Sequence, residues 1–429
     1  MMIEAGEIIT QAGRLMKNAP EMWFENPIPA DVQAAADAAL LSDRISDVWQ
    51  RLVSPAVKRK LRTFSSGEAA RLIGVSDGYL RQLSLSGEGP QPSSVSQTGR
   101  RAYTLEDINA LRTYLSAQSG PKVRNYLPHR NPGAGEDLQV LAVANFRSGS
   151  GKTTTAVHLA QYMALHGYRV LAIDLDPQGS MSSLLGYQPQ LDANTNASIY
   201  GAIRYDADQV PFGSVILKTH FPGLHLCPSN IELQEFEHAT PRNLAMRYAG
   251  EGNEAGEHFF ARVRAAIAMV ADDYDVVILD CPPQLGFLTL SALCAATAVI
   301  VTVNPQMLEV ASMSQYLHMI SDLLSVAREA GGKPNFSFLR YLITQYEPSD
   351  GLQTQIVAFL RGQLGERVLT APMAKSTAIS DAALTGQTLY EVGREGFSRA
   401  TYDRAIESLA AVSSEIEGLV KAAWGRSDR

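Results

Sequence analysis

Short apolar runs alternate with stretches of helical periodicity along the chain from Leu138 onward. Three of these runs, VLAVA, VLAI and VVIL, contain no polar residue, as is typical of strands that are buried on both faces. Alternation of such strands with amphipathic helices indicates a parallel sheet with helices on both sides. We therefore predict the α/β class, with a doubly wound, mostly parallel sheet, for residues 138–429.

The first 137 residues follow different patterns. Residues 1–60 are polar and helical, with a proline break at NPIPA, and residues 61–118 form a small unit with its own caps and turns. Residues 119–137 are rich in proline, glycine and charge, which favours a linker. We therefore predict four parts: an N-terminal helical segment, a small domain, a linker and the α/β domain.

The small unit has the spacing of a helix-turn-helix. Ser65 and Glu68 form a capping-box pattern, Gly74 ends the first helix, and Ser76 caps a second. In such motifs the start of the second helix reaches base edges in the major groove of DNA. The candidate DNA-reading residues are Ser76, Asp77, Tyr79, Arg81 and Gln82.

A two-stranded wing and a third helix are predicted next. Thr104 with Asp107 is another capping-box pattern, and Arg100 and Arg101 lie on the strand before it. The segment resembles the winged helix-turn-helix of MerR-like regulators, which implies that both arginines contact DNA phosphates. The alternative is a plain helical hairpin that docks on the next domain.

The charge distribution supports a nucleic-acid partner. Residues 51–130 hold 13 Lys and Arg against 5 Asp and Glu, although the whole chain carries a net charge of −7. A solvated basic face without a partner is the alternative. The three cysteines have no CxxC spacing, and no stretch reaches the roughly 20 apolar residues that span a bilayer. We therefore expect a cytoplasmic protein without a membrane segment.

A phosphate-binding loop is predicted between the VLAVA strand and the helix that follows it. Glycine-rich loops at helix N-termini present backbone N–H groups to phosphate. Lys152 is placed to reach the β- and γ-phosphates, and the Thr153 hydroxyl to reach Mg²⁺. The strict GxxxxGK[ST] pattern fails, because Phe146 stands where its first glycine would be.

The run Arg147-Ser148-Gly149-Ser150-Gly151-Lys152-Thr153 resembles the deviant Walker A loop of the ParA, MinD and nitrogenase-iron-protein group of P-loop NTPases. The family motif reads Lys-Gly-Gly-x-Gly-Lys-[Thr/Ser], so Arg147 replaces its first lysine and Ser148 its first glycine. The resemblance implies that Arg147 reaches the nucleotide of a second subunit. Arg and Lys are not interchangeable at such positions.

Carboxylates follow two further buried strands, at the edge where open α/β sheets bind ligands. The resemblance implies that Asp176 orients the attacking water, that Asp280 holds Mg²⁺ through water, and that Asp174 assists at the metal or the switch. The predicted catalytic residues are Arg147, Lys152 and Asp176, and the predicted metal residues are Thr153, Asp174 and Asp280. The predicted ATP-binding set is Ser148, Gly149, Ser150, Gly151, Lys152, Thr153, Thr154, Asp174, Asp280, Asn304 and Pro305.

Further runs extend the resemblance over nearly the whole chain. VNPQMLEVASMSQYL, LITQYEPSDG and MAKSTAISDAALTGQTLYEV are similar to plasmid-partitioning ATPases, specifically the RepA proteins of RepABC-type cassettes. The family's Thr-Arg-Tyr-Glu-Pro run has Gln345 in place of arginine. Within the shared runs, Lys375 is a candidate DNA contact, with an ordinary surface lysine as the alternative.

This resemblance implies a DNA-segregating ATPase that uses ATP and Mg²⁺. Its ATP-bound dimer sandwiches the nucleotides, binds DNA without sequence preference and associates with the nucleoid. A ParB- or RepB-like centromere-binding partner and DNA stimulate weak basal hydrolysis. The winged unit represses its own operon, and residues 1–60 are expected to form a nucleotide-independent dimer.

Three rival interpretations remain. A MinD-like membrane ATPase needs a basic amphipathic C-terminal helix, but acids interrupt the tail here. A reductase like the nitrogenase iron protein needs cluster-ligating cysteines, whereas Cys281 and Cys294 lie in apolar runs. An ATP-responsive transcription regulator with little or no partition activity is the third.

Overall fold

The computed structural model describes residues 29–52, 59–188, 196–248, 258–394 and 396–426. Its internal contacts divide the chain into two units, residues 1–58 and 59–429. In the first unit, α2 (Ala30–Leu52) confirms the helix expected after the proline break. The expected helix before that break lies outside the described residues, and dimerisation through this unit stays a prediction.

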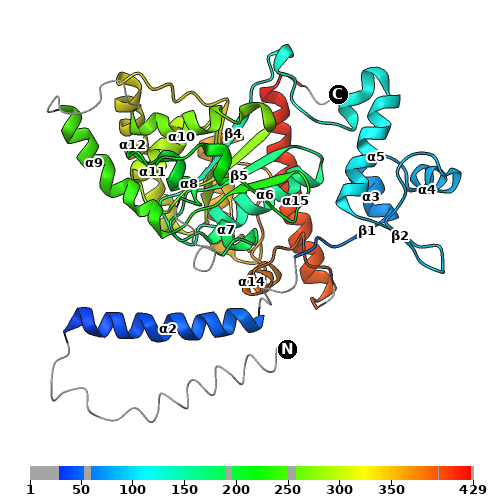
Figure 1. Ribbon diagram of the computed structural model, residues 1–429, viewed down its shortest axis with the longest axis horizontal. Coiled ribbons are helices and arrows are strands. Elements are labelled where there is room, and N and C mark those ends of the chain that lie inside the picture. The colour runs from blue at the N-terminus through cyan, green and yellow to red at the C-terminus, as the bar shows by residue number, and fades with distance from the viewer. Residues whose placement is uncertain (1–28, 53–58, 189–195, 249–257, 395, 427–429) are drawn as a thin grey trace, which may run out of the picture. The chain divides into compact units, whose positions relative to one another are not determined.

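A seven-stranded sheet forms the centre of the second unit (Figure 1). The strand order is β10-β9-β4-β8-β5-β7-β6, and every pair is parallel except β6 with β7 at the edge. The predicted mostly parallel sheet is therefore confirmed. The strands are β4 (Gln139–Ala144), β5 (Val170–Asp174), β6 (Leu217–Lys218), β7 (Leu224–Cys227), β8 (Val276–Asp280), β9 (Ala298–Val303) and β10 (Phe338–Ile343).

Helices cover both faces of this sheet because side chains of a strand alternate between its faces. On β4, Leu141 and Val143 belong to a core with α6 and α15, while Ala142 and Ala144 face a core with α10, α11, α12 and α13. Figure 1 shows α6 and α15 on one side of the sheet and α10, α11 and α12 on the other. The helices are α6 (Lys152–Leu165), α7 (Ser180–Leu184), α8 (Ile199–Ile203), α9 (Gln234–Tyr248), α10 (Phe259–Ala268), α11 (Phe287–Ala295), α12 (Met307–Glu329), α13 (Gly351–Leu364), α14 (Thr377–Leu384) and α15 (Arg399–Ala423).

The segment before the linker has the three helices that its sequence predicts, with the expected caps. The two predicted wing strands, β2 and β3, are joined by a strand that was not predicted, β1, in a three-stranded sheet of order β1-β3-β2. Both capping boxes form, and Gly74 ends the first helix with a left-handed φ of 84°. The elements are β1 (Phe64–Ser65), α3 (Ser66–Ile73), α4 (Asp77–Ser86), β2 (Ser94–Val95), β3 (Arg101–Tyr103) and α5 (Leu105–Gln118).

A buried arginine joins this segment to the α/β body. Arg112 of α5 is 1% exposed, and its guanidinium donates to the carbonyls of Leu72 at 2.7 Å and Leu165 at 2.5 Å. These carbonyls lie at the C-terminal ends of α3 and α6, where the helix dipole favours a cation. Burial lowers the pKa of Arg112 to about 10, which leaves it charged at neutral pH.

The predicted linker is packed against the body. Glu136 is buried and pairs with Arg426 just beyond α15, at 2.7 Å. His129 and the backbone N–H of Arg130 both contact the buried carboxylate of Asp275, beside the start of β8. The internal contacts place the small segment, the linker and the α/β domain in one unit, residues 59–429. The domain boundaries predicted at residues 118 and 137 therefore stay predictions.

All three cysteines, Cys227, Cys281 and Cys294, are free and buried. Burial raises the pKa of each thiol, to about 11 for Cys294. The part of the chain that the structure describes contains no helix long and apolar enough to cross a membrane.

Candidate nucleotide-binding site

The predicted phosphate-binding loop lies between the end of β4 and the start of α6. Gly149 and Gly151 have left-handed φ angles of 77° and 85°, which glycine adopts without strain. A Cβ at Gly151 would lie 3.4 Å from the side chain of Thr344, so the loop also packs closely there. Ser148, which replaces a family glycine, is not left-handed, and its backbone therefore accommodates a side chain.

Side chains from neighbouring strands hold the loop in this shape. The Thr302 hydroxyl donates to Ser150 Oγ at 3.0 Å, and the Thr344 hydroxyl donates to the Ser150 carbonyl at 2.8 Å. Gln345, with a left-handed φ of 52°, donates its side-chain amide to the Gly149 carbonyl. From sequence, Gln345 stands out only as a departure from the family motif, and no sequence pattern marks Thr302 or Thr344.

Lys152 is the buried cation of the site. Its ammonium group donates to the carbonyl of Arg147 at 2.8 Å, and the residue is only 6% exposed. Burial lowers the pKa of Lys152, while the negative charges of Asp280, Asp176 and Glu309 oppose that shift. A lysine beside a ring of loop N–H groups is the arrangement that binds phosphate oxygens.

Two of the predicted carboxylates, Asp174 and Asp176, lie at and beyond the end of β5. Asp174 is buried and accepts hydrogen bonds from the Ser182 backbone at 2.8 Å and the Ser182 hydroxyl at 2.7 Å. It also accepts from the backbone N–H of Asp176 at 3.1 Å. Both oxygens of Asp174 thus have protein donors, and they fix the turn that carries Asp176.

Asp280, at the end of β8, is in the opposite situation. It is fully buried, and neither of its carboxylate oxygens has a hydrogen-bond partner. Burial, followed by the charge of nearby Asp174, raises the pKa of Asp280, while Lys152 and Thr153 act against that shift. A buried carboxylate without partners needs a cation or ordered water. These residues therefore fit a hydrated Mg²⁺ ion beside Thr153.

Arg147 makes an ion pair that no sequence motif indicates. Its Nη1 lies 2.8 Å from Oε1 of Glu309, in the first turn of α12. The backbone N–H of Arg147 donates to Asn145 Oδ1 at 3.0 Å, and Asn145 donates its side-chain amide to the Thr302 carbonyl. Glu309 and Asn145 could not be found from spacing, since neither belongs to the loop motif.

The remaining predicted nucleotide-site residues follow β9 and β10. Asn304 and Pro305 come directly after β9, which neighbours β4 in the sheet, and Asn304 Oδ1 is buried without a partner. Lys375 is exposed and pairs with Glu347 at 3.1 Å. Its backbone N–H donates to the Tyr346 carbonyl, in the same loop as Gln345.

The predicted DNA-reading residues line the exposed side of α4, whose Leu80 and Leu83 face the core. Ser76 caps the helix, and Asp77 accepts a hydrogen bond from Ser66 at 2.5 Å. Tyr79, Arg81 and Gln82 are exposed, as is Arg100. Arg101 is half-buried and donates from Nε to Ser84 at 2.9 Å.

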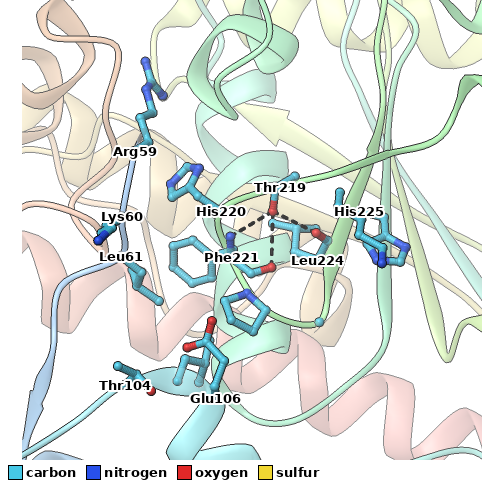
Figure 2. Close-up of a pocket in the computed structure, with 14 residues that line it drawn as sticks. Arg59, Lys60, Leu61, Thr104, Glu106, Thr219, His220, Phe221, Leu224 and His225 are labelled. Atoms are coloured by element: carbon cyan, nitrogen blue, oxygen red, sulfur yellow. Dashed lines mark hydrogen bonds between the residues drawn. The ribbon is translucent and has the colours of Figure 1, made fainter. Parts of the chain in front are cut away.

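A cavity of about 540 Å³ lies elsewhere, between the N-terminus of α5, residues 59–61 and the β6–β7 hairpin (Figure 2). It contains none of the predicted nucleotide-site residues. The cavity borders the N-terminal end of β7, whereas the phosphate loop follows the C-terminal end of β4. Because these strands run in the same direction, the cavity and the loop lie at opposite ends of the strands.

Comparisons with known proteins give a consistent result. A family model described as an AAA domain matches residues 138–330. "Putative replication protein A" of Rhizobium rhizogenes is 52% identical over 93% of this chain and 96% of its own length. Protein SopA of Escherichia coli K12 is 30% identical over 86% of this chain and 92% of its own length. Chromosome partitioning protein ParA of Caulobacter vibrioides is 30% identical over 58% of this chain and 85% of its own length.

One solved structure, titled "Partition Protein", covers 90% of this chain and 98% of its own with a TM-score of 0.61. At 20% identity, this likeness shows a shared fold.

Proposed function

This chain belongs to the ParA family of partition ATPases, and on that premise we propose that it is an ATP-driven DNA-segregation protein that uses Mg²⁺. The observation that carries the proposal is the phosphate loop with a buried lysine, Lys152, whose charge interacts with the buried, unpartnered carboxylate of Asp280. Similarity to a relative named as a chromosome partitioning protein adds support. Mg²⁺, when bound, would neutralise the charge that develops on the phosphate oxygens.

Each part of the site has a role in this proposal. The N–H groups of residues 148–154 bind the phosphates, and Lys152 contributes its charge. Asp280, with Thr153, holds the hydrated metal ion. Asp176, on the turn fixed by Asp174, orients the attacking water. Phosphoryl transfer depends mainly on such positioning and charge stabilisation.

The proposal includes a nucleotide-sandwich dimer that associates with the nucleoid. Its ATP-bound form binds DNA without sequence preference, with Lys375 as a contact, and a ParB- or RepB-like centromere-binding protein stimulates hydrolysis. Residues 61–118 form the second DNA-binding surface, which recognises an operator and represses the operon. The exposed face of α4 favours that role, as does the basic charge of residues 51–130, which include this segment and both of its flanks.

The test is ATP turnover with purified protein, alone, with non-specific DNA, and with the centromere-binding partner. Basal turnover should be weak and should rise with both additions. Lys152→Ala should abolish nucleotide-dependent DNA binding, while Lys333→Ala, at an exposed lysine before β10, serves as the matched control. Asp176→Ala should keep ATP binding and stop turnover. ATP-dependent DNA binding that survives Lys152→Ala would contradict the site assignment.

The alternative function, an ATP-responsive transcription regulator, makes a different prediction. Its DNA binding would require an operator sequence and the winged segment. Binding of random-sequence DNA that depends on ATP and weakens with salt favours the partition function, since phosphate contacts release counterions. Operator-dependent binding alone, without partner-stimulated turnover, would favour the regulator.

A further inference from the structure

Glu309 is a largely buried acid beside the nucleotide site that has no role in the function proposed above. Only 12% of its side chain is exposed, and its Oε1 lies 2.8 Å from Nη1 of Arg147, 162 positions earlier in the chain. Long side chains lose rotamer entropy when they are held in one geometry. A paired, largely buried carboxylate therefore fixes the end of an arginine that would otherwise sample many directions.

The backbone of Arg147 is also held at both of its polar groups. Its N–H donates to Asn145 Oδ1 at 3.0 Å, and its carbonyl accepts from Lys152 Nζ at 2.8 Å. The preceding Phe146 packs its ring 5.2 Å from that of Tyr316, on the same helix as Glu309. Helix α12 thus contacts both the residue before Arg147 and the tip of Arg147 itself.

The rest of the guanidinium remains accessible. Arginine has five N–H donors in a planar fork, and 38% of the Arg147 side chain is exposed while Glu309 engages Nη1. A fork held at one edge by a carboxylate keeps its other edge for a second anion, such as a phosphate oxygen. The ion pair is therefore compatible with a nucleotide contact through the other edge of the guanidinium.

We propose that Glu309 is a positioning residue for ATP hydrolysis, which holds the Arg147 guanidinium in the direction from which it reaches the nucleotide phosphates of the second subunit. The inference rests on the proposed function, because it assumes that this site hydrolyses ATP in a nucleotide-sandwich dimer to which Arg147 contributes. Glu309 acts through Arg147 and makes no contact of its own with the nucleotide. Its contribution is preorganisation, which lowers the cost of reaching the reactive geometry.

The test is a double-mutant cycle of Arg147→Ala and Glu309→Ala, read as kcat and KM for ATP with DNA and partner present. We expect Glu309→Ala to lower kcat by about tenfold, the loss of one orienting contact, and to leave KM within about twofold. In the Arg147→Ala background the same change should have no further effect. Asp322→Asn, at an exposed acid on α12, is the matched control and should match wild type.

Glu309→Gln provides the second variant, since it keeps the shape and an acceptor oxygen without the charge, and its kcat should be intermediate. Normal or faster turnover of Glu309→Ala would overturn the proposal, as would an equal loss in both Arg147 backgrounds. If the wild-type protein hydrolyses ATP normally and only these expectations fail, the proposed function stands. If wild type shows no ATP turnover, the proposed function fails, and the role of Glu309 fails with it.

Discussion

At the scale of single residues, the buried His158 of α6 should make the stability of the protein depend on acid pH. It is 4% exposed, its Nδ1 donates to the Thr154 carbonyl at 2.7 Å, and its Nε2 is buried without a partner. Burial lowers the pKa of His158 to about 4. The unfolded chain, with a pKa near 6.5, therefore binds more protons than the folded chain between these values.

The free energy of unfolding should consequently fall as the pH drops from about 6.5 to 4, by up to about 3 kcal/mol from this group. His158→Asn keeps a side-chain donor for the Thr154 carbonyl and removes the titrating imidazole. When urea unfolding is measured at several pH values, the free energy of unfolding of this variant should therefore change less with pH than that of the wild type. His238→Asn, at an exposed histidine, should keep the wild-type slope. An unchanged slope in His158→Asn would assign the acid sensitivity to other groups.

Spacing found the residues of the phosphate loop because they are neighbours in sequence, and it found Asp280 because strand ends meet at one edge of the sheet. It could not find Thr302, Thr344 or Glu309. These lie 152, 194 and 162 positions from the loop residues they contact, and only the folded sheet brings them together. The opposite environments of Asp174 and Asp280 also depend on tertiary packing.

At the scale of elements, the sequence predicts the helices before the linker together with their capping residues, because capping depends on residues close in sequence. The sequence does not predict how α5 packs against the α/β body. Arg112 contacts carbonyls 40 and 53 positions away, and no local pattern marks it as buried.

Arg112→Met should therefore destabilise the protein by roughly 3 kcal/mol, since it removes the donor shared by two helix C-termini and leaves buried carbonyls unpaired. Arg112→Lys should recover little of that loss, because one ammonium group cannot reproduce the fork. Thermal and urea unfolding measure both variants. Arg71→Met, at an exposed arginine on α3, is the control. Wild-type stability of Arg112→Met would show that α5 docks mainly through its apolar side chains.

At the scale of the whole molecule, hydrogen bonds and ion pairs to Asp275 hold the predicted linker against the sheet. Its buried carboxylate accepts from the Arg169 guanidinium at 2.7 Å and the Arg130 backbone at 3.1 Å, and lies 2.8 Å from His129. Sequence composition favoured a loose connection, since the aspartate that orders this segment lies about 145 positions later.

These partners hold the pKa of Asp275 well below its usual range, against the opposing effect of burial. The stabilisation is therefore complete above about pH 4 and is lost as the pH falls below that value. Asp275→Asn should lower the free energy of unfolding at pH 7 by about 3 kcal/mol and remove that part of the acid dependence. Asp381→Asn, at an exposed acid on α14, is the control. A variant as stable as wild type at pH 7 would contradict the role.

The burial of every cysteine has a practical consequence for spectroscopy. Thiolates are the species that maleimide dyes modify, and the three native thiols are both inaccessible and held protonated. The natural chain thus offers a nearly silent background for site-directed labelling. A fluorophore on Leu308→Cys, an exposed position one residue before Glu309, would report on binding events at the surface beside Glu309 and Arg147.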